Sequence, residues 1–200
     1  MTWVKVCGLR RAEDVEAAVA AGADAIGFVL VPESPRAVTI DQAADLGQDT
    51  EALRIILTRD LLPDELVATA LATGADGVQP YGAHSDAAAS AAMEAGLMVL
   101  RPVPVTRPVV VDEVPPDQMP LLDRGSPYRL GGSGVAFDYS WLPLGDRPFV
   151  LAGGLRADTV ARAIHQTRAW GVDASSGLES TPGRKDPELI HRFVLEARRA

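Results

Sequence analysis

The sequence lacks the features that mark several large classes of protein. It has one cysteine among 200 residues, which excludes an intramolecular disulfide framework and a cluster of cysteine metal ligands. Its longest apolar runs, such as residues 25–31, are far too short to span a bilayer, and the start shows no basic segment followed by a long apolar one. We therefore expect a cytoplasmic protein with no membrane partner.

Positive charge and histidine are also scarce. The 27 acidic residues outnumber the 19 basic residues by 8, and the basic residues form no run, which argues against nucleic acid as a partner. His84, His165 and His191 lie far apart in the sequence, so they indicate no metal site. The expected partner is a small molecule.

The residues that are present are typical of a folded domain. The hydrophobic fraction is 47% and the charged fraction 23%, as in ordinary globular proteins. A chain of this length is expected to form one domain, here residues 1–200, and to bury roughly 70% of the surface that its unfolded chain exposes.

Short apolar runs alternate with longer alanine-rich amphipathic runs. The apolar runs are nearly continuous, which is typical of strands buried in a parallel sheet. The glycines of Ala21-Gly22-Ala23-Asp24, Thr73-Gly74-Ala75-Asp76 and Ala95-Gly96-Leu97 each follow a helical run and precede a strand, as left-handed helix ends do. The predicted strands are 3–6, 25–31, 53–57, 77–79, 97–100, 119–122, 148–151 and 171–172, and the predicted helices are 12–21, 41–46, 63–72, 85–95, 157–166 and 187–199.

Eight strands in this order predict a (β/α)₈ barrel. The alternative is an open doubly wound sheet, which is expected to carry a glycine-rich phosphate turn after its first strand. The first strand here ends in Cys7-Gly8-Leu9-Arg10 and has no such turn, so the barrel is favoured. The proline-rich segment 101–118 predicts that the fifth helix is short or missing.

Reactive groups of a barrel gather where its strands end. The first predicted strand ends at Cys7 and the sixth at Asp123. Small residues follow the last strands, as Gly131-Gly132-Ser133-Gly134, Gly153-Gly154 and Ser175-Ser176-Gly177. Such turns let backbone N–H groups converge on an anion, and the turns after strands seven and eight are a recurrent phosphate site.

Several short motifs occur in a fixed order at the predicted strand ends. They are Lys5-Val6-Cys7-Gly8, Gly27-Phe28, Ser34-Pro35-Arg36, Leu121-Leu122-Asp123, Gly131-Gly132-Ser133-Gly134, Phe137-Asp138, Ala152-Gly153-Gly154-Leu155, the segment 172–179, Pro182-Gly183 and Lys185-Asp186. Through these motifs the chain resembles, over nearly its whole length, the phosphoribosylanthranilate isomerase family of tryptophan biosynthesis. One departure is Val78-Gln79-Pro80-Tyr81-Gly82, where the family usually has Val-Gln-Leu-His-Gly.

The resemblance implies an Amadori rearrangement of N-(5′-phosphoribosyl)anthranilate. An acid protonates the ribose ring oxygen so that the ring opens to an iminium, and a base removes the proton from C2′. The resulting enamine tautomerises to the ketone of the 1-deoxyribulose. This chemistry needs no metal and no cofactor.

By the same resemblance Cys7 is the candidate base and Asp123 the candidate acid. Without the family resemblance, Cys7 would be interpreted as a small buried hydrophobic residue, and Asp123 as a helix or turn cap. A base requires an environment that stabilises the thiolate, and an acid requires a raised carboxyl pKa.

The remaining candidates bind substrate. Arg36 is the candidate partner of the anthranilate carboxylate, although arginine is most often a solvated surface residue. Lys5 shares a strand face with Cys7, and we expect it to pair with Asp173 of the neighbouring last strand. The candidate substrate-binding residues are Arg36, Gly132, Ser133, Gly153, Gly154, Ser175, Ser176 and Gly177.

Three other functions stay open at this point. A histidine-pathway aminoaldose isomerase, or a dual-substrate form, resembles chains with aspartate in place of Cys7. A non-catalytic phosphate-ligand binding protein would have no need of Cys7 and Asp123 together. A thiol redox protein would need a second cysteine. A monomer is expected in preference to a homodimer.

Overall fold

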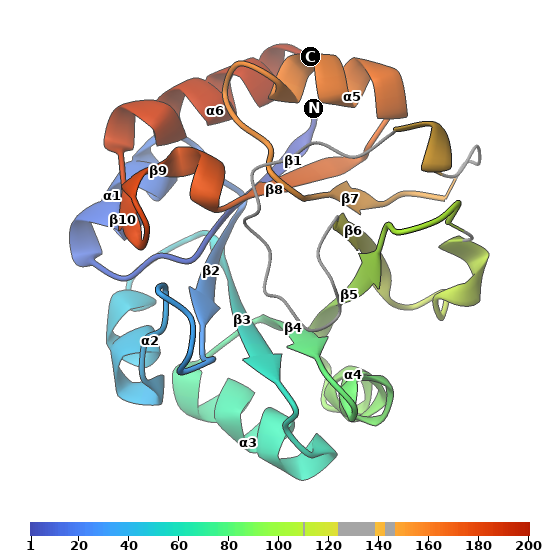
Figure 1. Ribbon diagram of the computed structural model, residues 1–200. Helices are drawn as coiled ribbons and strands as arrows, with labels where there is room; N and C mark the ends of the chain where they lie inside the picture. The colour runs from blue at the N-terminus through green and yellow to red at the C-terminus, as the bar shows by residue number, and fades with distance from the viewer. Residues whose placement is uncertain (110, 124–138, 143–146) are drawn as a thin grey trace.

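Eight parallel strands close into a barrel in the computed structural model, which describes residues 1–109, 111–123, 139–142 and 147–200. Figure 1 shows the strands at the centre with the helices around them. The barrel closes where β1 pairs with β8, with Lys5 in register with Asp173. The strands are β1 (Trp3–Cys7), β2 (Ala25–Val29), β3 (Leu53–Arg59), β4 (Gly77–Tyr81), β5 (Met98–Pro104), β6 (Met119–Asp123), β7 (Val150–Leu151) and β8 (Gly171–Ala174).

Helices connect most of these strands on the outside of the barrel, and the predicted (β/α)₈ barrel is confirmed. Between β5 and β6 the described residues contain only the short 3₁₀ helix η1 (Val111–Glu113), as expected from the prolines of this segment. The other helices are α1 (Ala12–Ala20), α2 (Ile40–Leu46), α3 (Pro63–Thr73), α4 (Ser85–Glu94), η2 (Tyr139–Trp141), α5 (Val160–Thr167), η3 (Ser176–Leu178) and α6 (Pro187–Arg199).

The repeated Gly-Ala-Asp segments work as local chemistry predicts. Gly22 and Gly74 follow α1 and α3 with φ of 87° and 62°, values that residues with a Cβ rarely adopt. Asp24 then accepts a hydrogen bond from the Val4 amide at 2.7 Å, and Asp76 accepts one from the Arg54 amide at 2.8 Å. Each segment therefore ends one helix and fixes the start of the neighbouring strand.

Two strands continue through proline residues past the ends that the sequence predicts. β4 continues through Pro80 to Tyr81, and β5 continues through Pro102 to Pro104. Proline has no N–H to donate, but β4 and β5 pair with each other only at Gly77–Met98 and Val78–Val99. Past that point each of the two strands pairs with a single neighbour, so the missing donors cost little.

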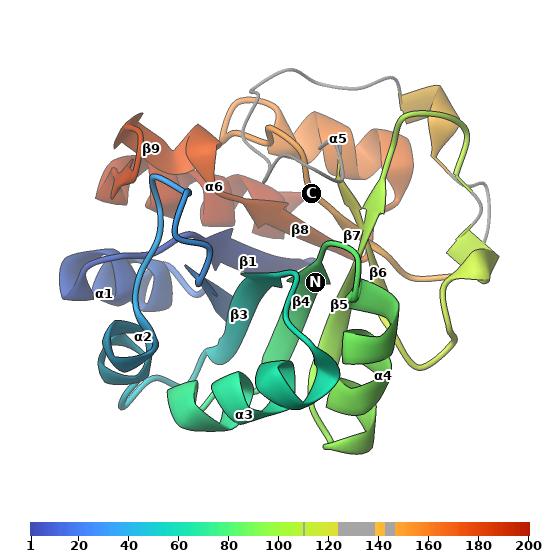
Figure 2. The same ribbon diagram turned by 60° about the horizontal axis from the view of Figure 1, so that its bottom comes forward.

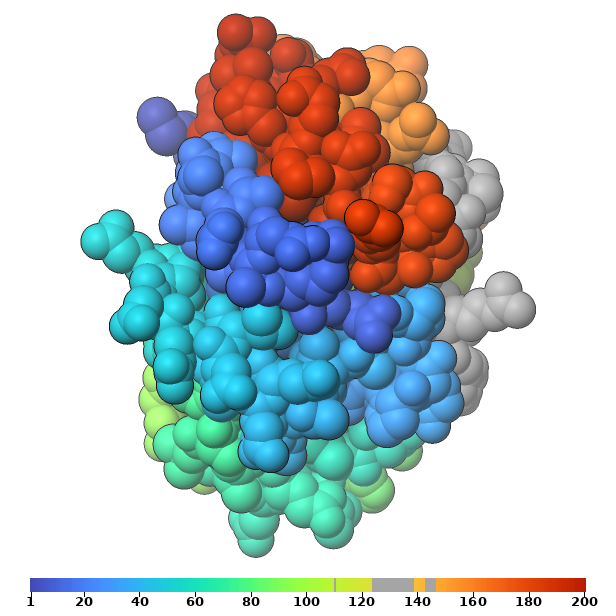
Figure 3. Space-filling model, turned by 90° about the vertical axis from the view of Figure 1, so that its left-hand side faces the viewer, coloured from blue at the N-terminus to red at the C-terminus, as the bar shows by residue number. Residues whose placement is uncertain are grey.

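The ends of the chain meet beside the barrel. The Arg198 guanidinium of α6 donates to the Thr2 carbonyl, and the same side chain reaches Asp24 at 2.9 Å. A hairpin of β9 (Glu179–Thr181) and β10 (Arg184–Lys185) lies against the β2–α2 loop, where a Cβ on Gly183 would come within 2.4 Å of the Pro35 carbonyl oxygen. Figure 3 shows this face, with the blue N-terminal segment beside the red C-terminal one.

Apolar side chains fill the barrel and the space under the helices. One cluster inside the barrel contains Ala25, Ile55, Leu100, Leu121, Val150 and Ala152. A second cluster, toward the carboxyl ends of the strands, contains Cys7, Val29, Val31 and Leu57. The turned view of Figure 2 shows the helices packed outside the sheet. No helix of the described part of the chain is both long and apolar enough to cross a membrane.

Candidate active site

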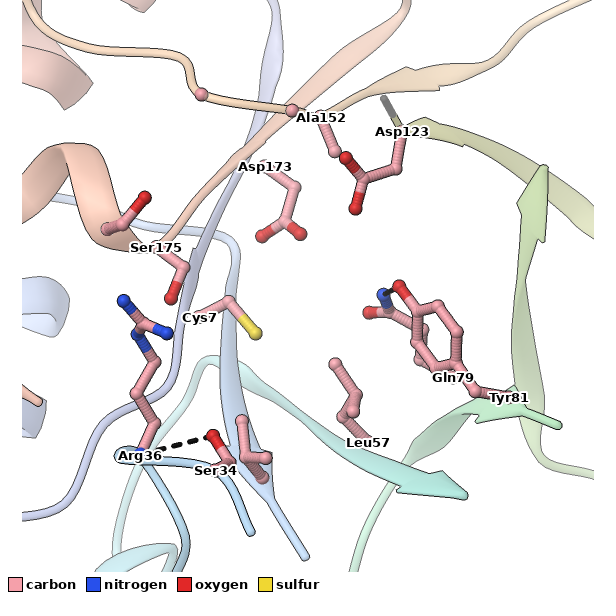
Figure 4. A pocket seen from close by; sticks show the side chains of 14 residues that line it. Cys7, Ser34, Arg36, Leu57, Gln79, Tyr81, Asp123, Ala152, Asp173 and Ser175 are labelled. Atoms are coloured by element: carbon pink, nitrogen blue, oxygen red, sulfur yellow. Dashed lines mark hydrogen bonds between the residues drawn. The ribbon is translucent and has the colours of Figure 1, made fainter. Parts of the chain in front are cut away.

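A cavity opens at the carboxyl ends of the strands, where a barrel places its reactive groups. Figure 4 shows that side chains from β1, β4, β6 and β8 surround it. Seven of the ten predicted site residues line it. The lining residues are Cys7, Val29, Ser34, Arg36, Leu57, Gln79, Tyr81, Asp123, Ala152, Gly153, Gly154, Asp173, Ser175 and Ser176.

Cys7 and Asp123 both line this cavity, from β1 and from β6. Both are buried, with 4% and 8% of their surfaces exposed. Gly27 of the neighbouring strand leaves room for the thiol, because a Cβ at this position would lie 2.8 Å from the Cys7 sulfur. The structure therefore brings a sulfur and a carboxyl group to one cavity from separate strands (Figure 4).

Lys5 lies below Cys7 on the same strand face and is fully buried. Its ammonium donates to Asp173 Oδ1 at 3.0 Å and to Gln79 Oε1 at 3.1 Å. The predicted pairing of Lys5 with Asp173 is confirmed. Burial would lower the pKa of Lys5, but the charge of Asp173 and the adjacent Cys7 raise it above its usual value, so Lys5 is a cation at neutral pH.

The charged groups around Cys7 have opposite effects on the pKa of its thiol. Burial raises the pKa of the thiol above its usual value, and the negative charge of Asp173 adds to this effect. The ammonium groups of Lys5 and Lys185 act in the other direction by stabilising the thiolate. Cys7 is therefore a thiol at neutral pH, with two cations near enough to favour its deprotonation.

Arg36 is held by a carboxylate from the β9–β10 hairpin. Its Nε and Nη2 donate to the two carboxylate oxygens of Glu179 at 2.7 and 2.8 Å. Lys185 donates to the same carboxylate at 2.8 Å, and also to the Ser175 carbonyl at 3.0 Å. Burial would raise the pKa of Glu179, but Arg36 and Lys185 lower it below its usual value. Two cations thus share one anion beside the cavity, which leaves a net positive charge.

Glycine and serine turns form the rim after β7 and β8. Gly153 and Gly154 have φ of 90° and 81°, so their backbone takes a course that other residues rarely adopt. Gly177 does not line the cavity. It lines a neighbouring hollow that shares Gly154 and Ser176 with it, and a Cβ on Gly177 would lie 2.1 Å from the Leu155 carbonyl oxygen. Gly132 and Ser133 lie outside the described residues.

The sequence analysis missed several polar residues of the site. Gln79 and Tyr81 alternate on β4, and the Gln79 amide donates to the Tyr81 hydroxyl oxygen at 2.8 Å. A polar residue at the end of a predicted strand was the available signal for Gln79. Glu179 and Lys185 were part of the family resemblance, but their contacts depend on the fold of the β9–β10 hairpin. Among the described residues, no group of three His, Cys, Asp or Glu side chains is placed to hold a metal ion.

Residues 4–196 match the family model of N-(5′-phosphoribosyl)anthranilate isomerase. The chain is also 40% identical to the N-(5′-phosphoribosyl)anthranilate isomerase of Rhodopseudomonas palustris, an alignment that covers 100% of this chain and 99% of the relative.

Solved structures agree with the sequence comparison. The phosphoribosylanthranilate isomerase of Thermotoga maritima superposes with a TM-score of 0.89 at 30% identity, over 100% of both chains. Another structure is of such an isomerase in complex with reduced 1-(o-carboxyphenylamino)-1-deoxyribulose 5-phosphate, with a TM-score of 0.84, 27% identity and 100% coverage of both chains. A further structure, of monomers generated from the Thermotoga maritima enzyme, describes that enzyme as dimeric.

Proposed function

The chain belongs to the N-(5′-phosphoribosyl)anthranilate isomerase family, and on this premise we propose that it converts N-(5′-phosphoribosyl)anthranilate to the corresponding 1-deoxyribulose phosphate in tryptophan biosynthesis. The reaction is an intramolecular aldose–ketose isomerisation. The observation that carries the proposal is one cavity lined by Cys7, by Asp123 and by the turns after β7 and β8.

Asp123 is the proposed acid and Cys7 the proposed base. Asp123 gives a proton to the ribose ring oxygen, the ring opens, and positive charge appears on the nitrogen attached to C1′. The C2′ proton becomes acidic next to this iminium, and the Cys7 sulfur takes it. The cations Lys5 and Lys185 support this role because they stabilise the thiolate form that accepts the proton.

Two sites hold the charged ends of the substrate in this proposal. Arg36 binds the anthranilate carboxylate, since its Nε and Nη2 already bind Glu179 and its Nη1 remains for a second anion. The phosphate lies against the turns of Gly153-Gly154 and Ser175-Ser176-Gly177. The two cations that share Glu179 favour a ligand with negative charge on this side of the cavity.

The reaction needs no cofactor, since both steps are proton transfers within one substrate. A monomer in the cytoplasm is the form in which we expect the enzyme to act, whereas the Thermotoga maritima relative is described as dimeric. A histidine-pathway isomerase remains the second candidate, and Cys7 speaks against it because that enzyme resembles chains with aspartate at this position.

A fluorescence assay with freshly generated phosphoribosylanthranilate tests the function. The wild-type chain is expected to consume the fluorescent substrate, and Cys7→Ser and Asp123→Asn are expected to do so at least about a hundredfold more slowly. Inactive wild-type protein that binds the product analogue would support a binding protein instead. Comparable turnover of the histidine-pathway aminoaldose would support the second candidate.

A further inference from the structure

Four polar side chains form a hydrogen-bonded series across the floor of the cavity. Asp173 accepts from Lys5 at 3.0 Å, Lys5 donates to Gln79 at 3.1 Å, and Gln79 contacts the Tyr81 hydroxyl at 2.8 Å. Asp173, Lys5 and Gln79 are buried, with 8%, 0% and 2% of their surfaces exposed. The series starts at β8, passes β1 and ends on β4.

Lys5 fixes the direction of every hydrogen bond in this series. An ammonium group only donates, so the Gln79 amide must turn its oxygen toward Lys5. The amide nitrogen then points to Tyr81, and because this nitrogen only donates, the Tyr81 oxygen must accept. The hydroxyl hydrogen of Tyr81 is therefore not used by Gln79 and is available to another acceptor.

The Tyr81 hydroxyl lies at the wall of the reaction cavity. Its side chain lines the cavity opposite Cys7, and Figure 4 shows its oxygen on the side that faces Asp123 and Asp173. Burial raises the pKa of the hydroxyl well above its usual value, and the charge of Asp123 adds to this effect. Tyr81 thus keeps its proton at neutral pH and is a donor.

We propose that Tyr81 binds the substrate by donating its hydroxyl hydrogen to an oxygen of the pentose between Cys7 and Asp123. The proposal rests on the proposed function, which places the pentose there. Hydroxyl and carbonyl oxygens of the sugar can accept a hydrogen bond, both in the substrate and in the ketose product. Gln79 and Lys5 act as positioning residues, because their hydrogen bonds orient this donor.

Replacement of Tyr81 by phenylalanine removes the donor and keeps the ring. We expect Tyr81→Phe to raise KM for phosphoribosylanthranilate about tenfold, the effect of one lost hydrogen bond, and to change kcat by less than about threefold. The dissociation constant of the reduced product analogue is expected to rise by a similar factor. Tyr139→Phe is the matched control, since it loses the same hydroxyl outside the cavity, and it is expected to leave both constants unchanged.

A second variant tests the direction of the hydrogen bond. Gln79→Glu offers Tyr81 a carboxylate oxygen in place of an amide N–H, so the hydroxyl turns to donate to residue 79 and no longer to the sugar. We expect Gln79→Glu to weaken analogue binding about as much as Tyr81→Phe. The double variant is expected to be no weaker than either single variant, because both remove the same donor.

The outcomes separate this proposal from the proposed function. Analogue binding within twofold of wild type in Tyr81→Phe overturns the proposal. A loss of kcat at unchanged analogue affinity also overturns it, because Tyr81 would then only hold the Gln79 side chain in place. Absence of wild-type turnover overturns the proposed function, and the affinity of the analogue still decides whether Tyr81 contacts this class of ligand.

Discussion

The two buried lysines of the active site, Lys5 and Lys185, have similar burial but different charged surroundings. Lys5 faces one carboxylate, Asp173, so its cluster is neutral. Lys185 shares Glu179 with Arg36, so its cluster keeps one positive charge. A neutral buried cluster is complete without ligand, whereas a positive one is compensated by an anion. We therefore assign the Lys5 cluster to the support of Cys7, and the Lys185 cluster to the binding of the charged substrate.

The largest expected effect concerns the neutral cluster. Lys5→Met leaves Asp173 buried without its cation, and we expect the free energy of unfolding to fall by about 3–5 kcal/mol. Urea denaturation measures this change. Arg199→Met, which breaks the exposed pair of Arg199 with Glu196, is the control and is expected to cost less than about 1 kcal/mol. Equal losses in the two variants would contradict the assignment of Lys5 to a self-contained pair.

The second prediction concerns the groups that the neutral cluster supports. Cys7→Ala and Asp123→Asn are each expected to lower kcat at least about a hundredfold, the lower range of a general base or acid. Their melting temperatures are expected to stay near that of the wild type. Wild-type kcat in either variant would remove that residue from its proposed role.

The third prediction concerns the positive cluster. Lys185→Met leaves Glu179 paired with Arg36, so we expect a smaller loss of stability than in Lys5→Met. The net positive charge is gone, and KM for the doubly anionic substrate is expected to rise about tenfold. Steady-state kinetics and urea denaturation on the same preparations measure both effects. An unchanged KM would show that this cluster has no part in binding the substrate.

The smallest expected effect is a dependence on pH. Because burial raises the pKa of Cys7, its thiolate is a minor species at neutral pH. The rate at which iodoacetamide alkylates Cys7, with Cys7→Ala as the blank, is therefore expected to rise with pH, by no more than about tenfold per unit, and to reach no plateau below about pH 8.5, the ordinary pKa of a thiol. A plateau below pH 7 would mean that Cys7 is already ionised and that Lys5 and Lys185 outweigh burial.

The fold could be predicted because its signals are local. Glycines such as Gly22 and Gly74 end helices wherever they stand in the sequence, and each repeated unit adds one strand. β4 and β5 were predicted to end before their observed last residues, because proline is rare inside strands. The pairing on one side only, which permits Pro80 and Pro102, is a property of the closed sheet.

The site was predictable where its residues stand at strand ends. Cys7 and Asp123 end β1 and β6, and the pairing of Lys5 with Asp173 follows from closure of the barrel between its first and last strands. Gln79 and Glu179 were missed because their charged partners lie far away in the sequence, Lys5 on β1 and Arg36 in the β2–α2 loop. Sequence spacing carries no information about such contacts.

A crystal structure of the chain with reduced 1-(o-carboxyphenylamino)-1-deoxyribulose 5-phosphate tests the central claim most directly. The account predicts the carbon that corresponds to C2′ within about 3.5 Å of the Cys7 sulfur, with Asp123 on the other side of the pentose chain and the phosphate at the turns after β7 and β8. A ligand bound with this carbon remote from Cys7, or with Cys7 and Asp123 on the same side of the sugar, would contradict it.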